Sequence, residues 1–382
     1  MTPPAPHPAR RNTLKTLAAL GATALAPAWA QPGRAPAPAR AIQIAQIVDT
    51  SVAQQDVSKD FLIGSRAAWQ DINARGGIRG RPVQHLSIEV DGTVASLRAA
   101  LRQVADNPAC VALSGTAGDP VATQLVAELR QQNLALAHVA PWLQNSSIEV
   151  DDRTFPIFAA RQEQIGHALK SLTTMGVQEV GAVYASAQEY GLYQDDLQRI
   201  AAGMKLRLQS YRANGDLDRL GRQLTPGTPA ILLFVGGTPE LVQFTQGLEK
   251  QQRQRYIVAL ADVNLQTMTQ MGAARSTPVI ATQAVPMVNA SLPVVRSYRE
   301  TMARLFDEPP VSLSLAGFIA ARYTFEVLRE LDAPLTRQTA LAAFQRRSTL
   351  DVGGYRVAFD PQRRSATFVT QSMLTTDGRV IG

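Results

Sequence analysis

The sequence has 382 residues, of which 45% are hydrophobic, and its 38 basic and 31 acidic residues give a formal net charge of +7. A chain of this length is more than one core usually serves, so we expect two domains. Without a dense run of Lys and Arg interleaved with aromatic residues, we expect no nucleic-acid partner. The single cysteine, Cys110, lies in the apolar stretch ACVAL, which indicates a buried thiol and excludes an intramolecular disulfide.

Residues 1–30 predict a secretory signal peptide. They combine a basic start, an apolar run over 17–26 and small residues up to Ala30, a pattern too short to span a bilayer. The paired Arg10 and Arg11 favour twin-arginine export, with ordinary Sec export as the alternative. We therefore expect cleavage after Ala30 and a periplasmic mature protein, whose charge falls to about +4 when the three basic residues of the signal are removed.

A flexible, proline-rich leader is expected at 31–40, and from residue 41 short β-branched runs alternate with amphipathic segments. The first elements predicted, in chain order, are strand 41–48, helix 61–73, strand 83–90, helix 92–107 with Thr93 as its N-cap, strand 110–114, a helix opening at Asp119 and strand 134–139. The alternation continues with strand 154–160, helix 162–175, strand 179–185, helix 191–202, strand 205–211, a short helix near 216–224, strand 230–235, helix 239–251 and strand 256–260.

Two successive runs of strand–helix units predict two parallel, doubly wound sheets, each forming a Rossmann-like lobe of an α/β protein. After a strand at 279–285 the pattern changes to long helices. These are predicted at 292–306, 313–331 and 336–346, and paired strands follow around 355–360 and 366–382. Asp377 and Gly378 between apolar runs predict a hairpin turn.

Several phrases resemble one known family. They are AWQDINARGGIRGRPV at 68–83, GTAGDPVA at 115–122, ILLFVGGTPE at 231–240, VPMVNASLPVVRSYRE at 285–300, GFIAARYTFEVL at 317–328 and GGYRVAFD at 353–360. The ordered set is similar to the type I periplasmic solute-binding proteins of the branched-chain amino-acid ABC importer class, the leucine-binding-protein-like family. The resemblance implies two Rossmann-like lobes joined by a three-crossing hinge, with the ligand in the cleft between them. It places the first lobe at 41–157 plus 286–332 and the second at 158–285 plus 333–382.

The loop SGTAGDPVA, residues 114–122, is the first candidate ligand contact. Small and glycine residues lead directly into a helix, so the Thr116 hydroxyl and the N–H groups of Thr116, Ala117 and Gly118 suit a carboxylate at the helix N-terminus. The loop lacks the motif of a P-loop and the spacing of a dinucleotide site. In the resembled family it contacts the α-carboxylate of an amino acid. We interpret Asp119 as the helix cap rather than a ligand contact.

The other first-lobe candidates follow strand ends. Ser51 and Gln54 are candidate contacts at the rim of the cleft. Trp142 is either a wall of the ligand pocket or an aromatic at the lobe interface. Arg161, just past the first crossing, either pairs bidentately with an acidic group of the ligand or forms a salt bridge within the protein.

In the second lobe the resemblance points to an aromatic contact, for which we favour Tyr190 over Tyr193. Thr238 stands where the family frequently has a tyrosine, and Ala316 where related sequences often have Glu, so a leucine-type pocket is in doubt. Asp262 directly follows a buried strand and is the candidate partner for a ligand ammonium, with a helix-capping role as the alternative.

We therefore expect a monomeric periplasmic solute-binding protein that delivers a small amino-acid-like or carboxylate ligand to an ABC permease by hinge closure. The first alternative is a ligand-sensing clamp that docks on a membrane receptor or kinase. The second is an extracytoplasmic enzyme, for which the signs are poor. Its four histidines show no metal-ligand spacing, Ser114 lacks the glycine of a nucleophile elbow, and His138 has no evident Ser or Cys partner. We expect no catalytic residue, metal or cofactor.

Overall fold

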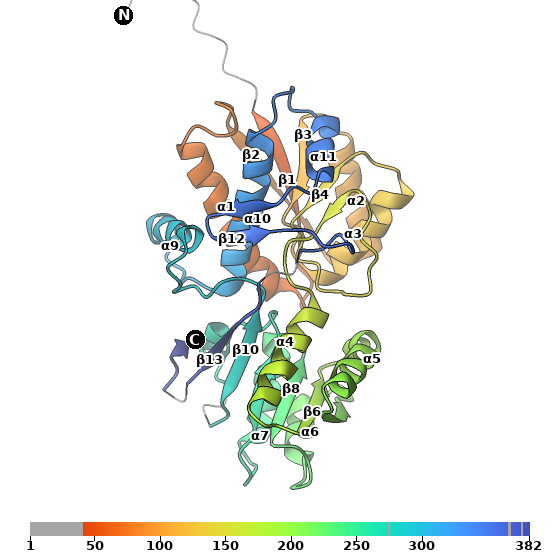
Figure 1. Ribbon diagram of the computed structural model, residues 1–382, viewed down its shortest axis with the longest axis vertical. Helices are drawn as coiled ribbons and strands as arrows, with labels where there is room; N and C mark the ends of the chain where they lie inside the picture. The colour runs from red at the N-terminus through yellow and green to blue at the C-terminus, as the bar shows by residue number, and fades with distance from the viewer. Residues whose placement is uncertain (1–40, 274–275, 366–367, 376) are drawn as a thin grey trace, which may run out of the picture. The chain divides into compact units, whose positions relative to one another are not determined.

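The computed structural model describes residues 41–273, 276–365, 368–375 and 377–382. The predicted signal peptide and leader, residues 1–40, lie outside the described residues. From residue 41 the strands sort into two large sheets, one in each of two lobes, as the sequence predicts (Figure 1).

The first-lobe sheet is wholly parallel. Its strands, in spatial order, are β2 (Val83–Val90), β1 (Ile42–Asp49), β3 (Cys110–Ser114), β4 (Ala137–Val139) and β5 (Thr154–Phe155). The apolar runs of β1 and β3 are buried almost throughout, as expected for parallel strands covered on both faces.

Helices cover both faces of this sheet. They are α1 (Gln55–Ala74), α9 (Pro293–Leu305), α10 (Ser312–Arg329) and α11 (Arg337–Gln345) on one side, and α2 (Val94–Ala105) and α3 (Asp119–Gln131) on the other. Helices α1 and α10 approach very closely because each carries a glycine at the contact. A Cβ on Gly64 would lie 1.7 Å from the Ser314 carbonyl oxygen, and one on Gly317 would lie 1.9 Å from that of Phe61.

The second-lobe sheet is parallel except for two antiparallel pairings at one edge, those of β13 (Thr370–Leu374) with its two neighbours. Its strands, in spatial order, are β7 (Arg207–Arg212), β6 (Glu179–Tyr184), β8 (Ile231–Val235), β9 (Tyr256–Ala259), β10 (Val279–Gln283), β13 (Thr370–Leu374) and β14 (Val380–Ile381). Helices α4 (Arg161–Thr174) and α5 (Ala187–Gly203) share one core cluster, whereas α6 (Leu217–Gln223), α7 (Thr238–Leu248) and α8 (Leu265–Gln270) share the other.

The chain passes between the lobes three times, between β5 and α4, between β10 and α9, and between β12 and β13. The third crossing therefore lies later than expected, and the assignment of all of 333–382 to the second lobe is corrected. Helix α11 packs on β3 and β4. The short hairpin of β11 (Leu350–Val352) and β12 (Tyr355–Val357) joins the same first-lobe core.

A half-buried arginine supports this placement. The Arg337 guanidinium donates to the carbonyl oxygens of Ala105 at 2.9 Å and Cys110 at 2.8 Å, satisfying acceptors left free where α2 ends and β3 begins. The sequence predicted this helix at 336–346, but not the surface on which the helix packs.

Local signals were confirmed at some ends and wrong at others. The Thr93 hydroxyl caps α2 by accepting from the Ser96 N–H at 3.2 Å, as predicted. The β13–β14 hairpin turns at Asp377 and Gly378, with Gly378 at φ +83°. In contrast, α5 begins at Ala187 after the cap Ser186, four residues before the predicted start, and α8 was not predicted.

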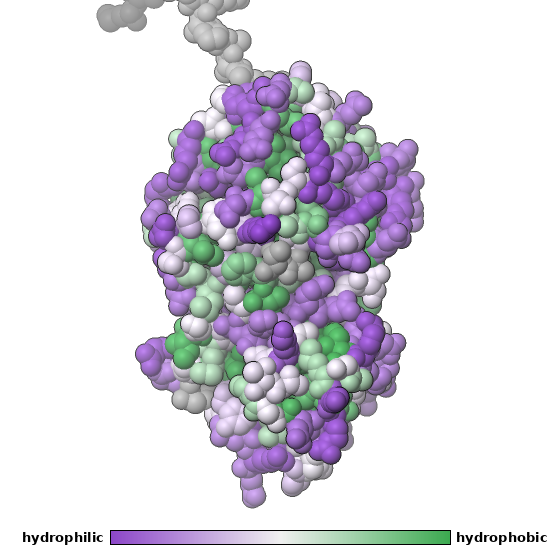
Figure 2. Space-filling model, in the orientation of Figure 1, coloured by the Kyte–Doolittle hydropathy of each residue, from purple (hydrophilic) through white to green (hydrophobic). Residues whose placement is uncertain are grey.

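Polar and charged residues cover most of both lobes on the face seen in Figure 2, with smaller apolar patches between them. Most large apolar side chains lie inside the two lobes. None of the described helices combines the length and apolarity needed to cross a membrane.

Candidate functional site

The carboxyl ends of the first-lobe strands carry the loop that the sequence singled out. Its residues extend the sheet, because the Ala117 N–H donates to the Ile47 carbonyl at 3.0 Å and the Asp49 N–H donates to the Ala117 carbonyl at 3.0 Å. Gly118 has φ +100°, and a Cβ there would lie 2.6 Å from the Asp49 Cβ. The backbone path of this loop is therefore fixed by β1 and requires glycine. The expectation that the Ala117 N–H faces a ligand is wrong, because β1 already uses that donor.

Thr116 supports this loop from below. Its side chain is fully buried, and its hydroxyl lies 3.0 Å from Nε2 of His138. Its carbonyl accepts from the Trp142 N–H at 2.8 Å. Burial lowers the pKa of His138 to about 3, so the imidazole is neutral at physiological pH. His138 lies in β4, and its Nε2 atom contacts the Thr116 hydroxyl.

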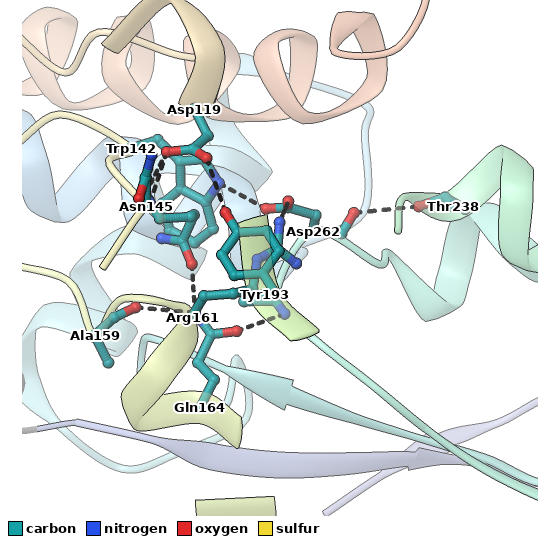
Figure 3. Close-up of polar contacts among 11 residues, drawn as sticks. Asp119, Trp142, Asn145, Ala159, Arg161, Gln164, Tyr193, Thr238 and Asp262 are labelled. Atoms are coloured by element: carbon teal, nitrogen blue, oxygen red, sulfur yellow. Dashed lines mark hydrogen bonds and ion pairs between the residues drawn. The ribbon is translucent and has the colours of Figure 1, made fainter. Parts of the chain in front are cut away.

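Asp119 does not cap its helix. Gly118 occupies the cap position, and the Asp119 carboxylate instead accepts from the N–H groups of Gln144 at 2.7 Å and Asn145 at 2.9 Å. Its other oxygen accepts from the Tyr193 hydroxyl of the second lobe at 3.3 Å (Figure 3). The cap interpretation is therefore wrong, because the loop after β4 offers backbone donors that no local pattern reveals.

Arg161 and Asp262 form a buried ion pair on the second-lobe side. Their Nη2 and Oδ2 atoms are 2.5 Å apart, and both side chains are at most 7% exposed. The second Asp262 oxygen accepts from Nε1 of Trp142 at 2.8 Å, a bond that joins the two lobes (Figure 3). For Arg161 the structure therefore shows the salt bridge, and for Asp262 it excludes the capping alternative, because Asn264 caps the following helix.

Trp142 is an aromatic of the lobe interface. It is 1% exposed and packs against Phe61 and Phe158, with ring centroids 5.9 and 5.5 Å away. Two interpretations of Trp142 were open, a wall of the ligand pocket and an aromatic at the lobe interface. The structure shows the second, because Trp142 contacts both the first-lobe core and Asp262.

The charges around Arg161, where the two lobes meet, do not balance. Burial by itself would lower the pKa of Arg161. The neighbouring carboxylates, Asp262 foremost and then Glu189 and Asp119, outweigh burial and raise the pKa above its ordinary value. Burial raises the pKa values of Asp119 and Glu189, and Arg161 only partly opposes the shift. Nε and Nη1 of Arg161 are buried without an acceptor among the described residues.

Two second-lobe candidates have other neighbours than expected. Tyr190 stacks edge-on against Tyr184, with centroids 5.1 Å apart, and lies under the Arg212 guanidinium at 4.5 Å. It is Tyr193 that reaches Asp119 and lies under Arg161, 5.1 Å from ring centroid to guanidinium. The choice of Tyr190 depended on a helix start at 191, and the earlier start at Ala187 turns Tyr193 toward the first lobe.

Thr238 holds the loop that carries Asp262. Its hydroxyl accepts from the Asn264 N–H at 2.9 Å and lies 3.4 Å from the Asp262 carbonyl oxygen. The first-lobe candidates Ser51 and Gln54 lie at the start of α1, where the Ser51 N–H donates to Asp49 at 2.9 Å. Asp119, Trp142, Tyr193 and Asp262 together with Arg161 form what we call the Arg161 cluster. No bond from Ser51 or Gln54 to this cluster is found among the described residues.

Two glutamines that the sequence reasoning missed connect the lobes behind Arg161. Gln164 donates to the Gln144 side-chain carbonyl and to the Ala159 carbonyl, and accepts from the Ala261 N–H at 2.9 Å (Figure 3). Their separation along the chain leaves no local signal. Among the described residues, no group of His, Cys, Asp and Glu is arranged to hold a metal ion.

Comparison with known proteins agrees with this fold. The model of the periplasmic binding protein family matches residues 41–375. None of the curated proteins compared matches the sequence.

Three solved structures illustrate the likeness in fold. The extracellular ligand-binding receptor from Verminephrobacter eiseniae ef01-2 has a TM-score of 0.81 at 18% identity, over 90% of this chain and 100% of that chain. The fatty acid ABC transporter substrate-binding protein from Thermomonospora curvata has 0.78 at 14%, over 90% and 91%. The branched-chain amino acid transporter substrate binding protein LivJ from Streptococcus pneumoniae, in complex with isoleucine, has 0.73 at 14%, over 90% and 98%.

The family match, the two doubly wound lobes and the three crossings agree with the resemblance read from the sequence. The chain belongs to the periplasmic binding protein family and has the type I fold.

Proposed function

We propose that this protein captures a small amino-acid-like ligand in the periplasm, between its two lobes, and delivers it to an ABC importer. The signal peptide with cleavage after Ala30, the monomeric state and the permease partner are parts of this proposal. The family consists of binding proteins, which favours binding over catalysis.

The observation that carries the proposal is that Arg161 is buried with two of its nitrogen donors unpaired within the described part of the chain. Its guanidinium is always charged and is 2% exposed, and two of its N–H-bearing atoms have no acceptor among the described residues. Buried donors of a cation that lack partners are costly, so an acceptor belongs there. A ligand carboxylate would complete the remaining edge of the guanidinium and could accept from the N–H groups of Thr116 and Gly118, since the Ala117 N–H already donates to Ile47.

The surplus of acids supports an amino group on the same ligand. Arg161 neutralises Asp262, which leaves Asp119 and Glu189 with raised pKa values at the same place. An ammonium group beside them would favour their ionised forms. A zwitterion of amino-acid type therefore supplies both charges that the cleft lacks. The LivJ neighbour is described with isoleucine and the Thermomonospora neighbour as a fatty-acid binder, so the fold alone does not select the side chain.

The mechanism follows from contacts on both sides of the cleft. A ligand that met only one lobe would bind the open and closed forms equally and would shift nothing. A carboxylate held between the 116–118 loop and Arg161 contacts both lobes, so it stabilises the closed form that a permease recognises. The same closed form would serve a sensor docking on a receptor.

A matched ligand series tests the charge requirement. The mature protein, residues 31–382, is refolded to remove copurified ligand and titrated with leucine, with 4-methylpentanoate, which lacks the amino group, and with 3-methylbutylamine, which lacks the carboxylate. The same trio is repeated for aromatic, acidic and basic side chains. We expect a rise in melting temperature, by mass action, with one amino acid and much less with its two truncated forms.

Arg161→Lys and Arg161→Met then locate the ligand, with Arg212→Met as a control that removes a guanidinium lying on Tyr190. We expect the affinity to fall at least tenfold in both Arg161 variants and to stay within about twofold in the control. Binding of an acid regardless of its amino group would remove the ammonium from the proposal. Unchanged affinity in Arg161→Met would overturn the placement of the ligand.

A further inference from the structure

A second contact between the lobes lies outside the Arg161 cluster. Asn264 is the N-cap of α8 in the second lobe, and its side-chain oxygen accepts from the N–H groups of Gln266 at 3.0 Å and Thr267 at 3.2 Å. These two bonds fix the orientation of the amide, because only the oxygen can accept them. The Nδ2 group of Asn264 must therefore point away from its own helix.

That Nδ2 group donates to Asp60 in the first lobe. The distance to Oδ2 is 2.7 Å, and Asp60 belongs to α1, which packs against α10. Asn264 is 5% exposed, so the bond is largely shielded from water. A groove of about 530 Å³, lined among others by Asn264 and Val311, lies beside it and also reaches both lobes.

The surroundings make this bond sensitive to charge. Asp60 faces the carboxylates of Asp56 and Glu308 and the ammonium of Lys59, and its charge also acts on the buried hydroxyl of Tyr298. A neutral donor on the opposite lobe can meet Asp60 without adding repulsion. A carboxylate at the same place would face three acids.

We propose that the Asp60–Asn264 bond is a clamp that holds the two lobes closed in the absence of ligand and so sets ligand affinity from outside the ligand site. The statement about affinity rests on the function proposed above. The statement about closure does not, because the bond uses only groups of the protein. When the protein is already closed, less of the binding free energy of the ligand is used to close it. Weakening the clamp lowers the fraction of closed protein and lowers the apparent affinity in the same proportion.

The decisive variant is Asn264→Asp. A carboxylate caps a helix as well as an amide does, so α8 keeps its cap, but the donor to Asp60 is replaced by a like charge. The reciprocal double variant Asp60→Asn/Asn264→Asp moves the amide to position 60 and the carboxylate to position 264, which restores one donor and one acceptor across the gap. Asn214→Asp adds the same charge to an exposed turn of the second lobe and is the matched control.

Small-angle X-ray scattering of the refolded, ligand-free proteins measures closure directly. We expect a larger radius of gyration for Asn264→Asp than for the wild type, and wild-type values for the double variant and for Asn214→Asp. Asp60→Ala removes the acceptor without touching the cap of α8, and we expect it to open the protein as well. If Asn264→Asp and Asp60→Ala both keep the wild-type radius, or if the double variant fails to restore it, the clamp is overturned.

Once a ligand is known, calorimetry completes the test. We expect Asn264→Asp to weaken binding about tenfold, the double variant to recover most of that loss, and both to keep the wild-type order of preference among ligands. A changed order of preference would place Asn264 in the ligand site and overturn the proposal. Failure of every ligand tested would count against the proposed function but leave the scattering result, and therefore the clamp, intact.

Discussion

The two edges of the lobe interface around Arg161 are built differently. The first-lobe edge, residues 114–118 with His138, is backbone and neutral side chains whose path is fixed by β1 and by the positive φ of Gly118. The second-lobe edge carries charge. Arg161 and Asp262 form an ion pair there, each side chain is at most 7% exposed, and Glu189 lies beside them. The first edge therefore supplies a rigid shape, whereas the second supplies the charges that choose among ligands. Substitutions should break the two edges in distinguishable ways.

The largest effect is expected at the charged edge. Arg161→Met leaves the buried Asp262 carboxylate without its cation, and we expect the free energy of unfolding to fall by about 3–5 kcal/mol. Urea denaturation followed by circular dichroism measures it. In Arg161→Met/Asp262→Asn the uncompensated charge is gone and the acceptor for Trp142 remains, so most of the stability should return while ligand binding stays lost. A single variant as stable as the wild type would contradict the pair's importance.

The neutral edge should respond to pH instead. The folded protein holds the pKa of His138 at about 3, whereas an unfolded histidine takes up a proton near about 6.5. Between those values the unfolded state binds the extra proton, so stability falls as the pH falls. The loss through His138 is about 3 kcal/mol at pH 4.5. We expect His138→Gln to lose correspondingly less stability than the wild type between pH 7 and 4.5, and equal losses would show that the imidazole is not buried neutral.

A smaller effect is expected at the loop itself. Gly118→Ala places a Cβ 2.6 Å from that of Asp49 at φ +100°, and we expect a loss of about 2 kcal/mol. The control is Gly166→Ala within α4, where a Cβ meets nothing within 4 Å and should stabilise by up to about 1 kcal/mol. Thermal unfolding compares the two variants. A Gly118→Ala protein as stable as Gly166→Ala would mean that the loop is not rigid.

Local sequence patterns predicted most of the fold. Alternating apolar runs and amphipathic segments gave the strands and helices of both lobes, and Thr93 and Asp377–Gly378 marked an end and a turn correctly. Where a helix end depended on a cap that was not recognised, as at Ser186, the start was four residues late. The sequence also placed residues 337–357 in the wrong lobe, because the pattern of α11 fixes which side of the helix is apolar but not which sheet that side covers.

The candidate site was predicted as a set of strand ends rather than as a network. The sequence drew attention to Thr116, Trp142, Arg161 and Asp262, because residues after buried parallel strands gather at one edge of a sheet. The structure joins Trp142, Arg161 and Asp262 by hydrogen bonds. The sequence assigned Asp119 to its own helix and preferred Tyr190 to Tyr193. Both choices were made from neighbours along the chain, whereas the partners of Asp119 come from a distant loop and from the other lobe.

The sequence by itself determined the family, the alternation of strands and helices and the residues that stand at the ends of strands, because these depend on periodicity and on contacts within a few residues. Only the tertiary structure decided that Arg161 pairs with Asp262, 101 residues away, and Asn264 with Asp60, 204 residues away. The first pair forms when distant elements of the second lobe pack together, and the second forms when the two lobes meet. Their partners are therefore set by packing in space, which leaves no local pattern along the chain.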